Sequence, residues 1–449
     1  MTFRRIFKTI RYFGIFVLII GFLILPLFAI FSRTGGVLHG SLSPILVPVL
    51  LVTLKQASFS CFASLALAGL FCSAVRNSTP LLNRLLLGIF SLPSMVLVGL
   101  FMVLAKRFNL EFGFSLVVGA HAYLNTPWIA LAVFEARKNF PSEWELSGRS
   151  LGASRGQIFF KLKLPWYASR VGVATAQVFA FCVMSFTIVL LLGGGPPMST
   201  LETEIFAQIR GGGLNVSEAA QFAVTELLLV ALPLVIVSRL RMKGSQAIAE
   251  TNIRASALPV NLNHRIDASV GTLVVLLWLA APLMVLGAGV FSDGIPTGEI
   301  FGLEFVRALG TSFLIATLSS VCALIFALLI FASPGGVRFR EVVKLFSILP
   351  LGMGALTLSL GFLLAYSLAP FTFLDPFSGN FTVILFLHAV LLLPLGYRFL
   401  VPVVSEGESI GRRNARFAAR SLGGGFFTAF RRVEWPYYRK GVSDFLRLA

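Results

Sequence analysis

The chain has 449 residues, of which 57% are hydrophobic and only 12% are charged, with a mean hydropathy of +0.88. Soluble domains carry about 25% charged residues, so this composition excludes an ordinary soluble enzyme, a disordered chain and a secreted disulfide scaffold. The net charge of +18 does not indicate nucleic acid, because the basic residues lie between long apolar segments. An all-α polytopic membrane protein is the class that remains.

The first apolar segment, 13–31, follows the basic residues Arg4, Arg5, Lys8 and Arg11, as the apolar part of a signal peptide would. It is long enough to span a bilayer, and no small-residue cleavage site closes it. We therefore expect a first membrane helix.

A bilayer core requires about 20 apolar residues per helix, and about ten segments of the chain meet this length. These segments lack the alternation of a membrane barrel. The second contains Lys55 and Gln56, so its buried part is expected to begin after them. The expected spans are 13–31, 48–75, 85–104, 114–134, 171–192, 219–238, 269–291, 308–332, 342–366 and 382–403.

The basic residues indicate which side of the membrane each loop occupies. A cytoplasmic N-terminus places most of the 37 Lys and Arg residues in inner segments. The outer loops then hold only Arg33, Lys106, Arg107, Arg210 and Arg307. Because positive charge favours the cytoplasmic side, we expect the N-terminus to be cytoplasmic.

The chain repeats itself loosely at a spacing of about 270 residues. Two short motifs and one later proline recur with matched spacing. The pairs are His121-Ala122 with Pro127 and His388-Ala389 with Pro394, Arg149 to Gly152 and Arg420 to Gly423, and Pro165 and Pro436.

Because six expected spans separate corresponding points, both copies face the same way across the membrane, which defines a parallel repeat. The expected domains are a first repeat with six spans at 1–238, a polar cytoplasmic linker at 239–268, and a second repeat with four spans at 269–449.

Each copy places an amphipathic basic segment in the cytoplasm, and the first covers 141–165. Gly152 and Gly156 are suited to a turn between two short helices, and Pro165 is expected to end the segment and restart the chain. A basic interfacial helix on anionic lipid is one interpretation. Because the segment appears twice with the same Gly-to-Pro spacing, docking of a cytoplasmic partner is the favoured one.

This segment resembles the EAA loop of binding-protein-dependent ATP-binding-cassette importers, in which E-A-A-x-x-x-G is followed by I-x-L-P. The Glu position of that pattern holds Leu146, one residue after Glu145, and Phe417 stands there in the second copy. The resemblance implies a type I importer permease whose loops contact an ATPase. The implied docking residues are Glu145, Gly152, Ala153, Leu162, Leu164, Pro165, Ala418, Ala419, Gly423 and Pro436.

Fusion of two permease copies narrows the resemblance to ferric-iron-type and thiamine-type permeases. The segment from Ser185 to Pro196, and the Val433-Glu434-Trp435-Pro436 ending, are similar to the thiamine type. This implies transport of thiamine or its phosphate esters across the bacterial inner membrane. The implied partners are a cytoplasmic ATPase dimer, a periplasmic substrate-binding protein and membrane lipid. A ferric-iron permease, a secondary transporter and an inactive truncated permease remain alternatives.

The sequence contains no G-x-x-x-x-G-K-[ST] loop, which an ATP site of that kind needs. We therefore expect no enzymatic activity in this chain, with ATP and magnesium bound by the partner subunit. His39, His121, His264 and His388 are scattered and predict no metal site.

Polar residues inside membrane spans are candidates for a translocation path, and bonding between helices is the alternative. The candidates are Glu226, Gln177 and Asn125, whereas His121 is expected to be structural because His388 repeats it. Gly193, Gly194, Gly195 and Pro196 follow the fifth span. They form either a flexible loop or an outer rim for a binding protein.

The last 13 residues given, Tyr437 to Ala449, include Arg439, Lys440, Asp444 and Arg447, so they do not fit a membrane span. We expect a cytoplasmic C-terminus and a second repeat without counterparts of the fifth and sixth spans. Transport would then be impaired unless another polypeptide supplies two helices.

Overall fold

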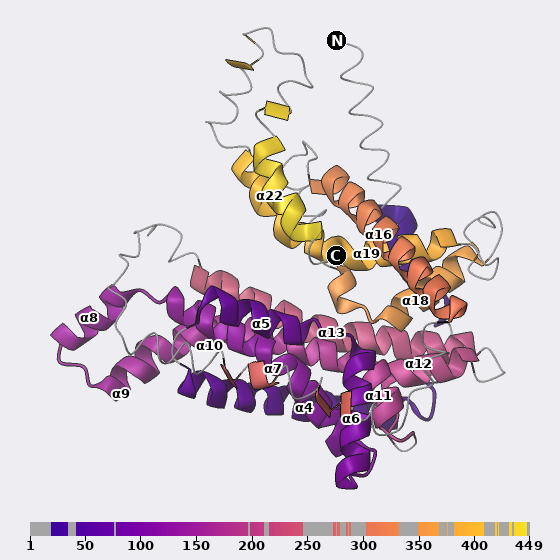
Figure 1. Ribbon diagram of the computed structural model, residues 1–449, viewed down its shortest axis with the longest axis horizontal. Helices are drawn as coiled ribbons and strands as arrows, with labels where there is room; N and C mark the ends of the chain where they lie inside the picture. Colours follow the sequence, from indigo (N-terminus) through magenta and orange to yellow (C-terminus); the bar gives the residue numbers. More distant parts are fainter. Residues whose placement is uncertain are drawn as a thin grey trace. The chain divides into compact units, whose positions relative to one another are not determined.

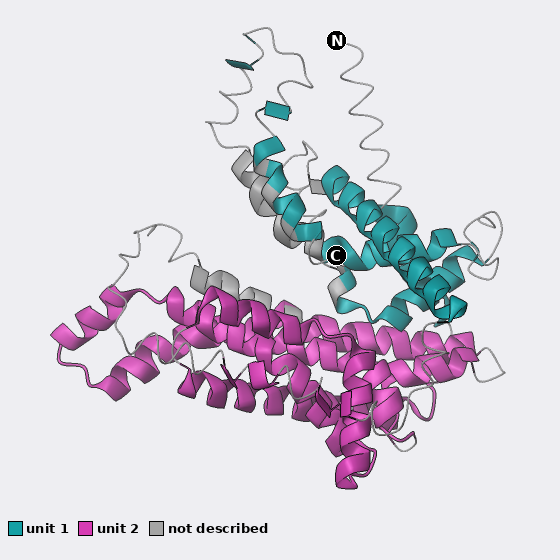
Figure 2. Ribbon diagram, viewed as in Figure 1, with its two compact units in different colours: residues 1–41, 296–449 teal, residues 42–295 magenta. Residues whose placement is uncertain are grey.

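The computed structural model contains helices and no strand in the residues it describes, which confirms the all-α membrane class. Those residues are 19–34, 42–75, 78–195, 198–210, 215–245, scattered positions between 273 and 288, 302–331, 349–367, 375, 381–407, 418–419, 421, 431–432 and 435–446. The chain forms two compact units (Figure 2): residues 1–41 with 296–449 are unit 1, and residues 42–295 are unit 2.

Unit 2 is a helical bundle built on four long helices (Figure 1). Helix α4 packs against α7 and α10, and α10 also packs against α13. Their shared core includes Phe71, Ile129, Phe134 and Val178. The bounds are α4 Leu46–Ala74, α7 Phe114–Lys138, α10 Leu164–Val183 and α13 Val216–Ser245.

The expected span at 85–104 is wrong as a single straight helix. The chain forms α5 (Pro80–Phe90) and α6 (Ser94–Phe108), which are bent by 80° at the break between them. Pro93 precedes α6; it lacks an N–H and disfavours helical geometry in the residue before it, so the helix is interrupted there.

The expected span at 171–192 is also interrupted. Helix α10 ends at Val183, residues 184–186 are not helical, and α11 runs from Thr187 to Leu192. Helix α12 (Leu201–Arg210) follows. In Figure 1, α6, α11 and α12 lie at the opposite end of unit 2 from α8 and α9, as two sides of a membrane require.

Gln56 corrects another expectation. It lies well inside α4 and is fully buried, although the buried part of this span was expected to begin after it. Lys55 beside it is exposed, with its ammonium 5.0 Å from the centre of the Phe114 ring. Successive helical residues point in different directions, so a polar pair does not mark the end of a buried helix.

Unit 1 also has a core of packed helices, although fewer of its residues are described. Helix α16 packs against α19, α22 packs against α19, and α18 packs against α2. The bounds are η1 Ile20–Ile24, α2 Leu25–Arg33, α16 Leu303–Phe331, η3 Leu349–Gly352, α18 Ala355–Tyr366, α19 Phe381–Gly407 and α22 Trp435–Leu446. Because α2 packs against α18, this N-terminal helix is grouped with the second half of the chain.

The repeat residues lie on corresponding helices of the two copies. His121 lies on α7 and His388 on α19, and Pro165 lies on α10 and Pro436 on α22. A parallel repeat predicts this placement.

Among the described residues, four helices are long and apolar enough to cross a membrane, or five if α5 and α6 form one broken span. The four are Leu46–Ala74, Phe114–Lys138, Val216–Pro233 and Leu303–Ile330. Most of 269–291, part of 342–366 and the linker after Ser245 lie outside the described residues. The division into 1–238, 239–268 and 269–449, with six and four spans, stays a prediction.

Candidate functional site

The segment at 141–165 forms a helical hairpin, which we call the hairpin from here on. It contains α8 (Ser142–Ser150), α9 (Arg155–Ile158) and the π-helical η2 (Phe159–Lys163), which leads directly into α10. Figure 1 shows α8 and α9 projecting from one end of unit 2. The expected pair of short helices is therefore confirmed.

The turn of the hairpin depends on Gly152. Its φ is +78°, a conformation that side chains with a β-carbon resist. The Gly152 N–H donates to the Arg149 carbonyl at 2.9 Å, and the Ala153 N–H donates to the Gly148 carbonyl at 3.0 Å. These two bonds form a Schellman motif, which ends α8 and satisfies its last carbonyls.

Two other sequence expectations for the hairpin are wrong. Gly156 lies inside α9 and not in the turn. Pro165 does not end the segment, because it occupies the first turn of α10, directly after η2. Proline removes an N–H from the helical chain, and the π-helical turn η2 directly before it is the local irregularity at which the hydrogen-bond pattern changes.

The two arms of the hairpin approach each other at Gly148. A β-carbon at this position would lie 3.4 Å from Ile158 Cγ1 and 3.5 Å from Leu162 Cδ1. Ile158 is only 3% exposed. Leu162, expected as a docking residue, therefore contributes to the packing of the hairpin itself.

Glu145 joins the same two arms electrostatically. Its Oε1 lies 2.6 Å from Arg149 Nη2, and its Oε2 lies 2.7 Å from Lys163 Nζ. The hydrogen bond from Lys163 is the largest of the effects that lower the pKa of this carboxyl. The sequence suggested Glu145 from its position, but its pairing with Lys163 depends on the hairpin turn.

Aromatic rings support the base of the hairpin. Trp144 of α8 packs edge-to-face on Trp166 of α10, with ring centroids 5.5 Å apart. Phe140 contacts both rings. The Trp166 indole N–H donates to the Ala136 carbonyl at 2.9 Å, and the Arg170 guanidinium lies 3.6 Å from its ring centroid. The hairpin is thus anchored to both α7 and α10.

The second copy of the hairpin is described only in part. Ala418 is exposed, Ala419 is half-buried, and Gly423 lies outside the described residues. Pro436 is exposed in α22, and residues 431–432 are π-helical, as 159–163 are. Leu164 is 42% exposed, and Ala153 is half-buried in the first copy. Their docking role stays a prediction.

Two of the translocation candidates bond to neighbouring helices. Asn125 Nδ2 donates to Cys182 Sγ at 3.5 Å, and Gln177 Oε1 accepts from Trp128 Nε1 at 3.2 Å. Bonds of this kind hold transmembrane helices together. Glu226 on α13 is fully buried. A place for these three residues on a translocation path stays a prediction.

His121 is the centre of a buried network that the sequence analysis did not recognise. Its Nδ1 lies 2.7 Å from Gln56 Nε2 and 3.2 Å from Ser60 Oγ, both on α4. Its Nε2 lies 2.8 Å from Ser185 Oγ, in the break between α10 and α11. His121 therefore links three parts of the bundle, which agrees with its expected structural role.

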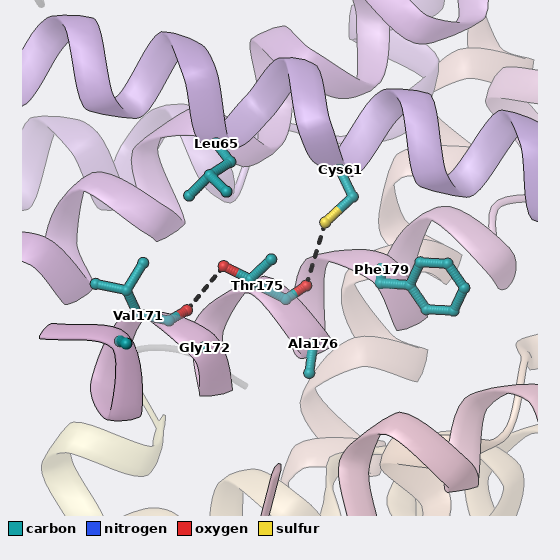
Figure 3. Close-up of a pocket in the computed structure, with 8 residues that line it drawn as sticks. Cys61, Leu65, Val171, Gly172, Thr175, Ala176 and Phe179 are labelled. Atoms are coloured by element: carbon teal, nitrogen blue, oxygen red, sulfur yellow. Dashed lines mark hydrogen bonds between the residues drawn. The ribbon is translucent and has the colours of Figure 1, made fainter. Parts of the chain in front are cut away.

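A groove of about 500 Å³ lies between α4 and α10 (Figure 3). Cys61 and Leu65 line one side, and Gly172, Ala176 and Phe179 are on the other. Among the described residues that line it, Thr175 is the one with a hydroxyl group, and its Oγ1 donates to the Val171 carbonyl at 2.8 Å within α10. None of Glu226, Gln177 and Asn125 lines this groove.

The glycines after α11 form a defined turn. Gly194 and Gly195 have φ values of +76° and +78°. A β-carbon on Gly193 would lie 2.4 Å from the Val189 carbonyl oxygen, so this position has no room for a side chain. The Leu192 carbonyl accepts from the Gly113 N–H at 2.8 Å. Pro196 lies outside the described residues, and the rim function stays a prediction.

Residues 65–243 match the family of the binding-protein-dependent transport system inner membrane component. This range contains α7, the hairpin, α10 and nearly all of α13. The predicted family resemblance is confirmed. The resemblance was based partly on Gly152 and Pro165, and both residues lie inside the matched range.

Several curated relatives are thiamine permeases. The thiamine transport system permease protein ThiP of Escherichia coli (strain K12) is 27% identical over 299 residues, which cover 64% of this chain and 54% of that protein. ThiP of Haemophilus influenzae is 24% identical over 336 residues, covering 73% of this chain and 60% of that protein. The chain thus spans little more than half the length of these relatives.

The name of a further relative does not state a substrate. The inner membrane ABC transporter permease protein YnjC of Escherichia coli (strain K12) is 35% identical over 145 residues, 32% of this chain and 27% of that protein.

Proposed function

We propose that the chain is a membrane-spanning permease subunit of an ATP-driven importer, with the hairpin as a docking element for a cytoplasmic ATPase subunit. The observation that carries this proposal is the hairpin itself, which projects from unit 2 in Figure 1 and is fixed by the Gly152 turn. The family match over residues 65–243 supports it. The chain acts as a transport subunit, and ATP hydrolysis belongs to the partner.

The mechanism that fits this arrangement is alternating access. Closure of two ATPase subunits on ATP would move the hairpin, and the hairpin is continuous with α10 through η2. Trp166 ties the same point to α7. Movement of the hairpin would therefore shift two core helices of unit 2 together, and binding of the ATPase must differ between the two states to drive that shift.

Replacement of Gly152 tests the docking role. Gly152→Trp places a β-carbon at a φ of +78°, so the turn would be strained, although no heavy atom lies within 4 Å of that carbon. We expect loss of ATPase co-purification with normal membrane insertion. Gly156→Ala is the matched control, because Gly156 lies inside α9 and its nearest neighbour would be Ser154 Oγ at 3.9 Å. Equal co-purification by both variants would contradict the docking role.

We propose thiamine, or its phosphate esters, as the substrate. The support is the sequence similarity to the thiamine permeases of two organisms, each over more than 60% of this chain. In cells that produce this chain with its ATPase and binding protein, uptake of labelled thiamine should be competed by its phosphate esters. Uptake of ferric iron without a response to thiamine would contradict the substrate.

A further inference from the structure

The carboxylate of Glu145 makes its contacts inside the hairpin. Each carboxylate oxygen of Glu145 contacts a different cation, Arg149 at 2.6 Å and Lys163 at 2.7 Å. The Glu145 side chain is 25% exposed. Releasing it to a second protein would break both contacts, so Glu145 is better placed to hold α8 against η2 than to bind a partner.

The hairpin exposes apolar side chains instead. Leu151, next to the Gly152 turn, is 87% exposed, and Leu146 on α8 is 63% exposed. Helix α8 contains no buried residue. Leucines in a loop outside the expected spans gain free energy when a partner removes them from water.

The surroundings of these leucines are mainly basic. The Arg149 side chain is 58% exposed, and Arg155 and Lys161 are exposed as well. Glu143 is the exposed acidic residue of α8. A surface complementary to the hairpin therefore has an apolar centre and acidic residues at its edge.

The projection of the hairpin favours a protein over a lipid surface. An amphipathic helix that binds lipid lies in the plane of the membrane interface. In Figure 1, the hairpin extends beyond the ends of α5 and α10, the bundle helices nearest to it. Its apolar residues are thus carried away from the bundle that spans the membrane.

We infer that Leu151 and Leu146 form an apolar tip that inserts into an apolar pocket with an acidic edge on the ATPase subunit, and that Glu145 is a positioning residue which braces the tip. This inference rests on the proposed function. In this inference the two leucines contact the ATPase subunit, and Glu145 does not.

The first test measures the apparent Kd between the chain in lipid nanodiscs and the ATPase subunit that co-purifies with it. Leu151→Ser should weaken binding about tenfold, as loss of one buried leucine predicts. Ser150→Ala is the matched control, because Ser150 is the exposed neighbour of Leu151, and it should leave the Kd unchanged. Unchanged binding by Leu151→Ser would overturn the apolar tip.

The second test is a double-mutant cycle on the brace. Glu145→Gln and Lys163→Gln should each weaken binding by about two- to fivefold, in line with the strength of partly exposed ion pairs. The double variant should show no additional loss, because both changes remove the same contact. Lys163→Arg should restore native binding.

Additive losses, or an effect of Glu145→Gln without one of Lys163→Gln, would contradict a brace formed with Lys163 and overturn this part of the inference. The amount of inserted chain is measured for every variant, so that a folding defect is recognised.

Failure of the proposed function has a different signature, because the native chain itself would then bind no ATPase. Binding of the native hairpin to vesicles of anionic lipid, lost with Leu151→Ser while ATPase binding is unchanged, would assign the tip to lipid and overturn the inference.

Discussion

In unit 2 the repeat histidine, His121, is 2% exposed and contacts side chains of α4 and of the break after α10. In unit 1 its counterpart, His388, is exposed on α19. In the described part of unit 1, aromatic rings gather around Phe22 instead. The Phe22 ring lies 4.6 Å from that of Phe386 and 6.2 Å from those of Phe326 and Phe362, measured between centroids.

This difference shows which structural features follow from a sequence repeat and which do not. The repeat places the two histidines on corresponding helices, α7 and α19, but the partners of each histidine come from neighbouring helices. At the spacing that relates His121 to His388, Gln56 and Ser60 of α4 correspond to Ala323 and Ala327 of α16. Both alanines are fully buried, and neither offers a polar side chain to a histidine.

Replacing each of the two histidines by leucine tests the difference between the units, and the largest effect is expected here. His121→Leu leaves the buried Gln56 and Ser60 and the half-buried Ser185 without their shared partner, and it should destabilise the protein by about 2–4 kcal/mol. His388→Leu changes an exposed position and should stay within about 0.5 kcal/mol. Thermal unfolding in detergent measures both. Equal losses would contradict the difference between the two units.

Glycine replacement tests the close packing of unit 1. A β-carbon on Gly361 of α18 would lie 3.0 Å from Pro26 Cβ and 3.1 Å from Ile30 Cδ1 of α2. Gly361→Ala should therefore destabilise unit 1 by about 1–3 kcal/mol.

The control is Gly69→Ala in α4, where no heavy atom lies within 4 Å of the new carbon. Helix propensity favours alanine there by up to about 1 kcal/mol. If both variants have the same unfolding temperature as the native protein, α2 and α18 are not closely packed.

The smallest expected effect concerns the contacts that Glu145 makes with Arg149 and Lys163. In the second copy, Phe417 stands at the Glu position of the EAA pattern. The pKa of Glu145 is lowered from its ordinary value of 4.5, mainly by the Lys163 hydrogen bond. A lowered pKa in the folded state stabilises the hairpin fully above that ordinary value, and this stabilisation is lost as the pH falls through the lowered pKa.

Partly exposed pairs contribute about 0.2–1 kcal/mol. The NMR signal of fluorine-labelled Trp144 should thus stay native down to about pH 5 and change only at lower pH. A Glu145→Gln variant should lack this transition. The same transition in that variant would assign it to another group.

Local patterns in the sequence predicted much of this structure. Gly152 with its flanking amphipathic residues predicted the hairpin, and long apolar segments predicted α4, α7, α13 and α16. Features that depend on distant residues were not predictable in this way. The pairing of Glu145 with Lys163 requires the turn, and the burial of Gln56 requires His121 on another helix. The bend between α5 and α6 did have a local signal in Pro93, which apolar length alone did not reveal.

ATP-driven uptake of labelled thiamine tests the central claim most directly. Vesicles would contain this chain with its ATPase and would receive the binding protein and thiamine outside. The account predicts accumulation that requires internal ATP, that is lost with Gly152→Trp and that is retained with Gly156→Ala. Accumulation without ATP, or undiminished accumulation with Gly152→Trp, would contradict an importer driven through the hairpin.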